Sequence, residues 1–334
     1  MTPRAKHWLK KTILRSSILR HAGRFAPPSA VILMYHSIVE EPNRTDHILG
    51  VSQPRASFEA HMETIARHFS PVTVGDVAQF AHSGRELPPR AVAVTFDDGF
   101  ADNSEVALPI LNRYGVPATV YIMVDAVANG TLPWYCRLRF AFNTTRKPEW
   151  RDMESNRNYQ LSFPEQRKAA LIAVWEKGAR TTGSIQEGFV RGVEESLDIE
   201  PVNGRQNFML NWDQVRSLRR AGHTIGAHTL SHPNLAHVSG DEARSEITGS
   251  KTRLEKEMNE PIEHFSYPHP ALNPQWSRQT LKFTREAGFQ SAVLTTSGPV
   301  RNGDDPHALK RIYASADLDQ FTWNLQCTFL GRSI

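Results

Sequence analysis

Two short motifs in the sequence carry side chains of the kinds that metal-dependent hydrolysis needs. The first places two carboxylates side by side, Asp97 and Asp98, within the run Thr-Phe-Asp-Asp-Gly. The second places two imidazoles four residues apart, His228 and His232, so that both can lie on one side of a helical turn. Two histidines and one carboxylate are a common ligand set for catalytic zinc. The remaining carboxylate, directly beside the metal ligand, could then serve as a base toward water.

Neither motif is specific by itself, because a chain with this many aspartates and histidines produces such pairs readily by chance. An isolated histidine pair is more often a surface or core feature than a set of ligands. The two motifs gain weight together, since their chemistry is complementary at one metal ion. A second aspartate pair, Asp304 and Asp305, lies between a glycine and a proline and is typical of a solvated turn.

Both motifs follow short apolar segments that are typical of strands buried on both faces of a parallel sheet. Asp97 comes directly after residues 91–96, and His228 comes directly after residues 223–227. Ligands of α/β proteins bind at the carboxyl ends of parallel strands, so both motifs are well placed for one site. The same pattern predicts further strands at residues 30–35, 118–124, 265–267 and 291–295.

Amphipathic segments between these strands predict helices. Their alternation with the strands predicts an α/β fold with right-handed crossovers, as a barrel or as an open doubly wound sheet. From about residue 129 to residue 207 the alternation is broken, and charged stretches such as 164–180 predict a helical insert. We therefore expect a basic helical extension over residues 1–28 and a main domain over residues 29–334 that contains the insert. The helices are predicted at residues 58–69, 104–114, 212–221, 241–258 and 277–287.

The order of these motifs, with an apolar segment before them that ends Met34-Tyr35-His36, resembles the polysaccharide deacetylases with NodB homology, carbohydrate esterase family 4. The resemblance extends from about residue 31 to residue 313, apart from the insert. It implies a distorted (β/α)7 barrel and the metal-dependent hydrolysis of N-acetyl groups on amino sugars. The opening strand is similar to that of the branch that deacetylates poly-N-acetylglucosamine.

The resemblance implies a role for each motif residue. Asp97 corresponds to the general base. The metal ligands correspond to Asp98, His228 and His232, and the implied cofactor is one divalent ion, for which zinc suits the ligand set while cobalt, nickel, manganese and iron stay open. In the branch just mentioned a histidine at the end of the opening strand protonates the leaving amine, so His36 is the candidate general acid. A buried strand-end histidine that bonds the backbone is the alternative interpretation of His36.

The sequence departs from the family at the motif that usually holds an arginine. Many members carry Arg-Pro-Pro-Tyr after the histidines, whereas residues 266–270 of this chain are Ser-Tyr-Pro-His-Pro. Arg311 could supply the missing guanidinium from another strand, or it could be an ordinary surface arginine. The Leu-x-x-His motif that often provides the acid is not found, and His307 lies in a polar loop that suits this role less well than His36 does.

Substrate contacts are expected from aromatic and imidazole side chains near the motifs. Tyr267 and His269 lie in the divergent motif, where backbone N–H groups could also help to hold an oxyanion. His269 fits a rigid proline-flanked loop equally well. Trp134 belongs to the insert, where it could stack on a sugar ring or fill the core of the inserted helices.

The expected substrate is an N-acetylated glycan, or a lipid-linked or nucleotide-linked sugar used in surface-polysaccharide metabolism. Two other functions stay open. One is a metal-dependent amide hydrolase acting on another group, such as a formyl, which would release formate rather than acetate. The other is a catalytically silent glycan-binding barrel, which the missing arginine motif favours and the complete four-residue site opposes.

The composition is that of an ordinary globular protein, with 334 residues, 40% hydrophobic and 22% charged residues, and a mean hydropathy of −0.45. This balance excludes disordered and fibrous classes. No apolar run approaches the roughly 20 residues that a membrane-spanning helix needs. Cys136 and Cys327 form no Cys-x-x-Cys pair, so we expect ordinary buried thiols rather than a disulfide framework or a cysteine zinc site.

The net charge of +4 comes from the N-terminal segment. Residues 1–24 contain seven lysines and arginines and no acid, and the rest of the chain has 32 basic against 35 acidic residues. A nucleic-acid partner is therefore not expected. Charges interrupt the apolar core that a cleaved signal peptide needs, which predicts a cytoplasmic protein. The segment could form a helix lying on the inner face of the membrane, or a solvated helix packed on the domain.

Overall fold

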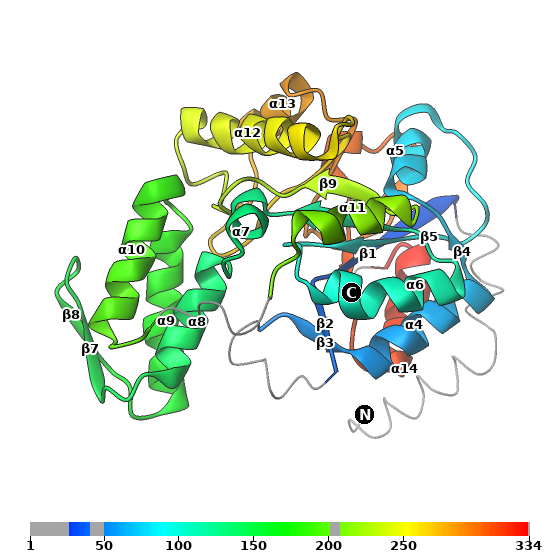
Figure 1. Cartoon of the computed structure of the whole chain (residues 1–334). Coiled ribbons are helices and arrows are strands. Elements are labelled where there is room, and N and C mark those ends of the chain that lie inside the picture. The colour runs from blue at the N-terminus through cyan, green and yellow to red at the C-terminus, as the bar shows by residue number, and fades with distance from the viewer. Residues whose placement is uncertain (1–26, 41–49, 201–207, 333–334) are drawn as a thin grey trace.

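A computed structural model describes residues 27–40, 50–200 and 208–332 of the chain. The predicted basic helix of residues 1–24 therefore lies outside the described residues. In the described part, a mostly parallel sheet curls into a half-barrel with helices packed around it (Figure 1), which confirms the predicted (β/α) barrel class. No helix of this part combines the length and the apolar composition that a membrane crossing requires.

The sheet runs in the order β11-β10-β9-β6-β5-β1-β12. Its neighbouring strands pair in parallel, except that β12 pairs with β1 in antiparallel fashion. Two short strands, β13 and β4, pair in parallel with β1 and β5. The strands are β1 (Ser29–Tyr35), β4 (Ser70–Pro71), β5 (Ala91–Phe96), β6 (Ala118–Ile122), β9 (Thr224–Ala227), β10 (His264–Ser266), β11 (Ser291–Val293), β12 (Val300–Arg301) and β13 (Ile312–Tyr313).

Burial and register explain why the motifs meet at one edge of this sheet. All six residues of β5 are buried, as a strand covered on both faces requires. Tyr35 pairs with Phe96, so β1 and β5 end at the same level. β9 ends beside β6 at Ala227. Asp97 and His228 are the first residues after β5 and β9, so both leave the sheet at its carboxyl edge.

The predicted helices are present with small differences at their ends. The helix expected at 104–114 differs most, because it begins as a π-helix over Asn103–Ala107 before α6 (Leu108–Tyr114). Pro109 has no N–H with which to continue an α-helical ladder, which accounts for the wider turn. Three helices that we did not predict are α5 (Val74–Ser83), α7 (Val124–Asn129) and α14 (Leu318–Phe329). The others are α4 (Arg55–His68), α11 (Trp212–Arg220), α12 (Gly240–Met258) and α13 (Arg278–Glu286).

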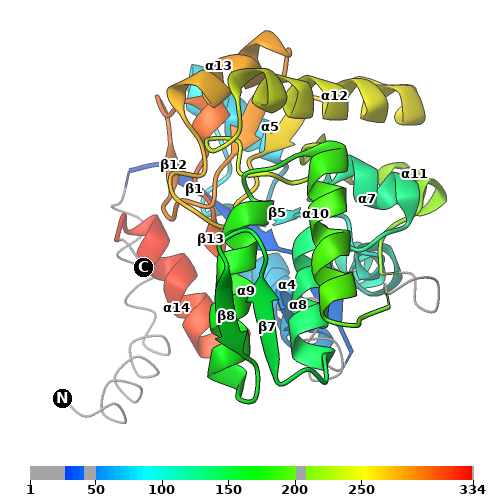
Figure 2. The same cartoon turned by 90° about the vertical axis from the view of Figure 1, so that its left-hand side faces the viewer.

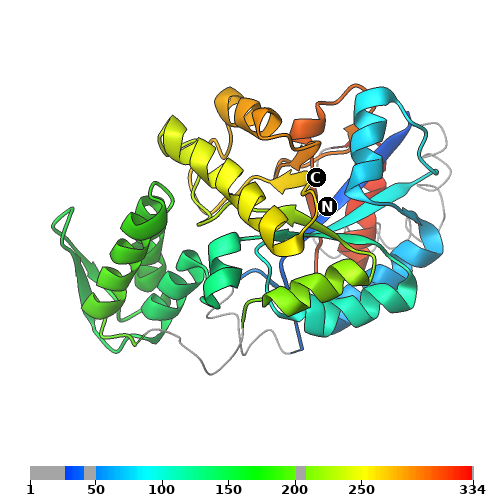
Figure 3. The ribbon, with the colours of Figure 1, turned by 45° about the horizontal axis from the view of Figure 1, so that its top comes forward.

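The segment that breaks the alternation forms a lobe at one side of the sheet (Figures 2 and 3). It contains the expected helices and, in addition, a β-hairpin that we did not predict. The hairpin escaped prediction because only Trp150 and Asp152 of its first strand are buried. Arg137 is buried and pairs with Glu194, which ties α8 to α10. The elements are α8 (Trp134–Thr144), β7 (Glu149–Asp152), β8 (Arg157–Gln160), α9 (Pro164–Gly178) and α10 (Gly183–Ser196).

Two further observations complete the fold. The strand β2 (Ser37–Val39) pairs in parallel with β3 (Ser52–Pro54) just after the end of β1. Cys136 and Cys327 are both buried and are not joined by a disulfide, which confirms that they are ordinary buried thiols.

Candidate active site

Asp98, His228 and His232 converge at the carboxyl edge of the sheet. All three are buried, and one potential ligand atom from each lies within 4.8 Å of the others. The Nε2 atoms of both imidazoles lie 3.4 Å from Asp98 Oδ1. Two nitrogens and one carboxylate oxygen that face one point form the donor set of a divalent metal site with open coordination positions.

The hydrogen bonds around this cluster fit a bound cation. Asp98 Oδ1 is buried and accepts no hydrogen bond from the described residues. Such an oxygen is unfavourable in a protein interior unless a cation or donor compensates for the lost water. His228 Nδ1 lies 2.8 Å from the carbonyl oxygen of Ser266, and because a carbonyl can only accept, Nδ1 carries the proton. In the neutral imidazole the lone pair therefore lies on Nε2, which faces Asp98 Oδ1.

Burial and neighbouring charge shift the pKa values of these three groups in different directions. Burial raises the pKa of Asp98, but the two imidazoles favour its charged form and hold the net pKa well below the usual range. Burial lowers the pKa of His228, and the carboxylates of Asp97 and Asp98 more than reverse this. Burial, followed by the nearby His228, lowers the pKa of His232 to about 3. His232 is therefore neutral near pH 7, as a metal ligand must be.

The backbone around the cluster is in an unusual conformation. Asp98 has a φ of 75°, Thr229 of 65° and His232 of 60°, all in the left-handed region that non-glycine residues rarely adopt. A hydrogen bond of 3.0 Å from the His232 N–H to Thr229 Oγ1 closes the turn between the two imidazoles. Strained backbone of this kind is found at sites where side-chain direction matters more than local stability.

Asp97 lies beside the cluster and is held by Arg311. Nη1 and Nη2 of Arg311 donate to the two carboxylate oxygens at 2.8 and 2.7 Å, a bidentate pair. Arg311 is fully buried, so its interpretation as a surface arginine is wrong. Burial raises the pKa of Asp97, but Arg311 more than offsets this and the net pKa lies below the usual value. Asp97 is therefore ionised near pH 7.

Ser266 contacts both Asp97 and the guanidinium of Arg311, the residue directly before β13. It occupies the first position of the motif that holds an arginine in many relatives, and its hydroxyl accepts from Arg311 Nη2 at 3.0 Å. The same hydroxyl donates to Asp97 at 3.3 Å. Arg311 also donates to the carbonyl oxygen of Leu294 and to Thr95 Oγ1, at 2.8 and 3.1 Å. From the sequence, Ser266 was noted only because it stands where many family members have an arginine, and no role was predicted for it.

His36 follows β1 and is half-buried. Its ring is nearly parallel to that of Tyr313, with centroids 6.4 Å apart. Its carbonyl oxygen accepts from Asn103 Nδ2 at 2.7 Å. After the larger effects given above, His36 also contributes to the lowered pKa of Asp97 and of Asp98.

Two of the three expected substrate contacts do not face the site. Tyr267 is fully buried, and its hydroxyl bonds Thr284 of α13 at 2.8 Å, so its side chain belongs to the core. Trp134 is also buried, and its Nε1 donates to the carbonyl oxygen of His232 at 3.1 Å. Trp134 thus supports the histidine turn instead of stacking on a sugar. His269 is exposed, with Nδ1 3.4 Å from Thr295 Oγ1.

Tyr135, the neighbour of Trp134, also reaches the cluster. Its ring centroid lies 4.9 Å from that of His232. The insert therefore contributes directly to the surroundings of His232. Nothing in the local sequence around Tyr135 marks it for this position, because the contact depends on how α8 packs against the main sheet.

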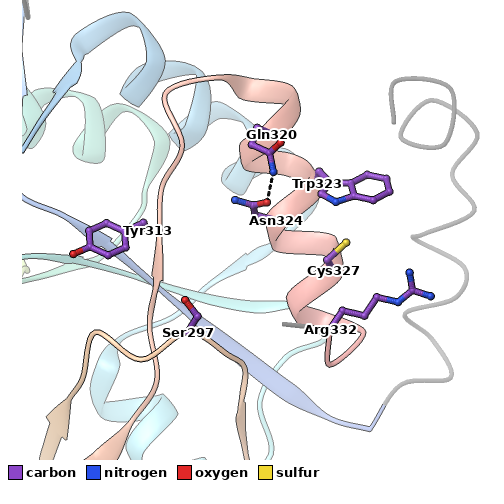
Figure 4. A pocket seen from close by; sticks show the side chains of 7 residues that line it. All are labelled: Ser297, Tyr313, Gln320, Trp323, Asn324, Cys327 and Arg332. Carbon is purple, nitrogen blue, oxygen red and sulfur yellow. Dashed lines mark hydrogen bonds between the residues drawn. The ribbon is translucent and has the colours of Figure 1, made fainter. Parts of the chain in front are cut away.

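A pocket of about 530 Å³ lies along α14 (Figure 4). Tyr313, whose ring is parallel to that of His36, is one of its lining residues. The catalytic and metal-binding candidates do not line this pocket. Its lining residues are Ser297, Tyr313, Gln320, Trp323, Asn324, Cys327 and Arg332.

Comparison with known proteins is consistent with this arrangement. A family model described as polysaccharide deacetylase matches residues 84–161 and 170–292, more than half of the chain. YxkH of Bacillus subtilis, named as a polysaccharide deacetylase, is 21% identical over 290 residues, which is 86% of this chain and 72% of YxkH. A chitooligosaccharide deacetylase of Azorhizobium caulinodans is 33% identical over 76 residues, 22% of this chain and 34% of that protein.

A solved structure shows the same fold. The Streptococcus pyogenes deacetylase PplD, in complex with acetate, superimposes with a TM-score of 0.60 at 20% identity, over 91% of this chain and 99% of that chain. At this identity the likeness concerns the fold. It agrees with the curled, mostly parallel sheet described above.

Proposed function

The chain belongs to the polysaccharide deacetylase family, whose members are carbohydrate deacetylases, and from this premise we propose that it removes N-acetyl groups from an amino-sugar glycan in a metal-dependent reaction. One observation carries the proposal. The unsatisfied oxygen of Asp98 faces two imidazole nitrogens, while the adjacent Asp97 is held separately by a buried arginine. One aspartate is thus available to a metal and the other to a proton.

Asp98, His228 and His232 would hold the divalent ion. Zinc suits two nitrogens and one oxygen, although cobalt, nickel, manganese and iron fit the same donors. A bound cation would polarise the acetamide carbonyl and favour the ionisation of water. The orientation of His228 is supported by its Nδ1 contact with Ser266. Such outer contacts fix the tautomer that a metal requires.

Asp97 would accept the proton of the attacking water. A base must be ionised and correctly oriented, and the bidentate contact with Arg311 serves both requirements. Arg311 is fully buried and makes further hydrogen bonds, so it can hold the carboxylate at a constant angle. Attack on the carbonyl would then leave an oxyanion that needs a donor. In the 267–269 loop the Tyr267 N–H already donates to Val293, and proline has none, which leaves the His269 N–H for this role.

His36 would protonate the leaving amine. An amine is too basic to leave an sp³ carbon without a proton, so an acid is needed opposite the base. His36 and Asp97 follow strands that end level and lie side by side, so one acetamide can reach both. The half-exposed imidazole can exchange its proton with water between turnovers.

We further propose that the glycan is a surface-polysaccharide component or its lipid-linked or nucleotide-linked precursor, handled in the cytoplasm at the inner face of the membrane. The support is the basic composition of residues 1–24, which is suited to anionic lipid. No partner beyond the glycan and the membrane surface is proposed.

An acetate-release assay tests the proposed function. Zinc-loaded protein would be incubated with N-acetylglucosamine oligomers and with nucleotide-linked N-acetylglucosamine, with metal content measured in parallel. We expect acetate from the wild type and a loss of at least about 100-fold in Asp97→Asn, with zinc content unchanged. Formate release from a formylated substrate without any acetate would indicate the other amide hydrolase. Binding of oligomers without any hydrolysis would indicate a silent barrel.

A further inference from the structure

We propose that Glu246, on α12, is a positioning residue that holds the turn between the two histidine ligands and so sets the affinity of the site for its metal. The inference rests on the metal site of the proposed function, and it adds a residue outside both motifs. Glu246 lies 14 positions beyond His232 in the sequence and is 4% exposed.

Three hydrogen bonds connect Glu246 to the turn. Its Oε2 accepts from the backbone N–H groups of Leu230 and Ser231 at 2.8 and 2.9 Å. Its Oε1 accepts from the hydroxyl of Ser231 at 2.6 Å. The two N–H groups belong to the residues between His228 and His232. One carboxylate therefore fixes the middle of the segment whose two ends carry the imidazoles.

The conformation of the turn explains why such a contact is needed. Thr229 and His232 are both left-handed, and this conformation is unfavourable for side chains branched at Cβ, such as threonine. Without a partner, the buried N–H groups at 230 and 231 would also be left without a hydrogen bond. Glu246 supplies that partner, so the strained turn is held by a contact from outside it.

The packing of α12 provides a second, independent observation. Gly249 lies almost one helical turn after Glu246, and a Cβ built on it would come within 2.8 Å of the Leu230 side chain. The absence of a side chain at Gly249 lets the helix approach the turn closely. A capping box between Ser239 and Glu242 fixes the start of the same helix. Glu246 thus reaches the turn from a firmly placed element.

Zinc titration of the purified full-length protein tests this role with the metal alone. Affinity would be measured by competition with a chelator for the wild type, Glu246→Ala and Glu246→Gln. Loss of an outer contact to metal ligands weakens affinity by about 10- to 100-fold, and we expect this range for Glu246→Ala. The Gln variant keeps one acceptor oxygen, so its loss should be smaller and in the same direction. If Glu246→Ala does not fold, the zinc affinity of Glu246→Gln alone tests the proposed role of Glu246.

Glu242→Ala is the matched control. Glu242 is on the same helix, where it caps the N-terminus and accepts from Thr182, and among the described residues its hydrogen bonds do not reach the turn. We expect this variant to lower thermal stability and leave zinc affinity within twofold of the wild type. The inference is overturned if both Glu246 variants bind zinc as the wild type does, or if Glu242→Ala weakens binding equally. A wild type that binds zinc and releases no acetate would overturn the proposed function alone, whereas one that binds no zinc would overturn both.

Discussion

Two aspartates that are adjacent in the chain have different partners. Asp97 faces a guanidinium, which balances its charge and fixes both of its oxygens. Asp98 faces two imidazole nitrogens and has an oxygen that no described donor satisfies. The left-handed backbone at Asp98 directs the two side chains apart. This difference allows one carboxylate to act on a proton while its neighbour is committed to a cation.

Replacing Arg311 should change how the reaction depends on pH. Burial raises the pKa of Asp97, and the net pKa lies below its ordinary value mainly because Arg311, with a further contribution from His228, favours the charged form, so Arg311→Met should raise that pKa. Asp97 must be ionised to act as a base. The acid limb of the kcat/KM profile should therefore move to higher pH, which a pH–rate series measures.

The same replacement should lower stability in a pH-dependent way. Because the folded pKa of Asp97 is depressed, the ion pair stabilises the fold above the unfolded pKa of the aspartate and loses this effect as the pH falls through the folded pKa. Breaking a buried pair costs about 3 to 5 kcal/mol near neutral pH. Arg137→Met, which removes the buried pair with Glu194 in the insert, is the control. Arg137→Met should leave the acid limb of the kcat/KM profile unchanged. The role of Arg311 would be contradicted if the acid limb moved in both variants, or if it moved in neither variant.

His36→Gln should remove the protonation of the leaving amine. We expect kcat to fall by about 100- to 10,000-fold, with zinc affinity retained, because general acid catalysis contributes on this scale. His82→Gln, at an exposed histidine of α5 that has no role in the site, is the matched control. If the kcat of His36→Gln equals that of the wild type, His36 is not the general acid.

At the scale of elements, the insert and the main sheet share the histidine turn. Trp134 of α8 donates to the carbonyl oxygen of His232, and the N–H of Asn234 donates to the carbonyl oxygen of Ala179 at 2.9 Å. A Cβ on Gly178 would come within 2.5 Å of the Trp134 ring, so α9 also packs closely against this indole. The insert therefore forms one wall of the site, although it interrupts the α/β alternation.

The Trp134→Phe variant tests whether the contact of the insert with His232 affects zinc binding. The variant keeps an aromatic ring and removes the Nε1 donor to His232, so we expect a stability loss of about 1 kcal/mol and a several-fold weaker zinc affinity. Trp150→Phe removes an equivalent donor to Ser196 Oγ, at 2.7 Å, within the insert. That control should lose similar stability and keep its zinc affinity. Equal affinities in the two variants would show that the insert does not support the site.

At the scale of the whole molecule, the fold brings together groups that are far apart in the chain. Asp97 and Arg311 are separated by 214 positions and are in direct contact. The carboxyl ends of β5, β9 and β1 supply the other members of the site. A parallel sheet has this property because all of its strands end at the same edge.

Metal binding should therefore stabilise the complete fold. A ligand that binds only the folded state adds about 2.7 kcal/mol when its free concentration is 100 times its Kd. We expect zinc to raise Tm in proportion, and a chelator to reverse the change. His228→Ala should lose the zinc-dependent increase, because one of the three ligands is gone. Calorimetric melts with and without zinc measure both, and an equal increase in the variant would contradict the proposed ligand set.

Local signals made much of the fold predictable. Apolar segments such as 91–96 identified the buried strands, and the residues directly after them identified the carboxyl edge. The capping box of Thr73 with Asp76 is a further local signal, because it marks the start of α5. The π-helix at Asn103 and the hairpin at Trp150 were missed, because their patterns resemble those of an ordinary helix and of a polar loop.

The sequence by itself determined which chemistry is available, because side-chain type and strand ends are encoded within a few neighbouring residues. Only the tertiary structure decided which distant groups complete the site. The sequence left open whether Arg311 lies at the surface, and the structure places it in the interior against Asp97. Trp134 was expected to contact a sugar, but it donates a hydrogen bond to His232. No sequence motif pointed to Glu246, which bonds the histidine turn. Such roles depend on which helices and strands pack together, and packing is set by contacts across the whole chain.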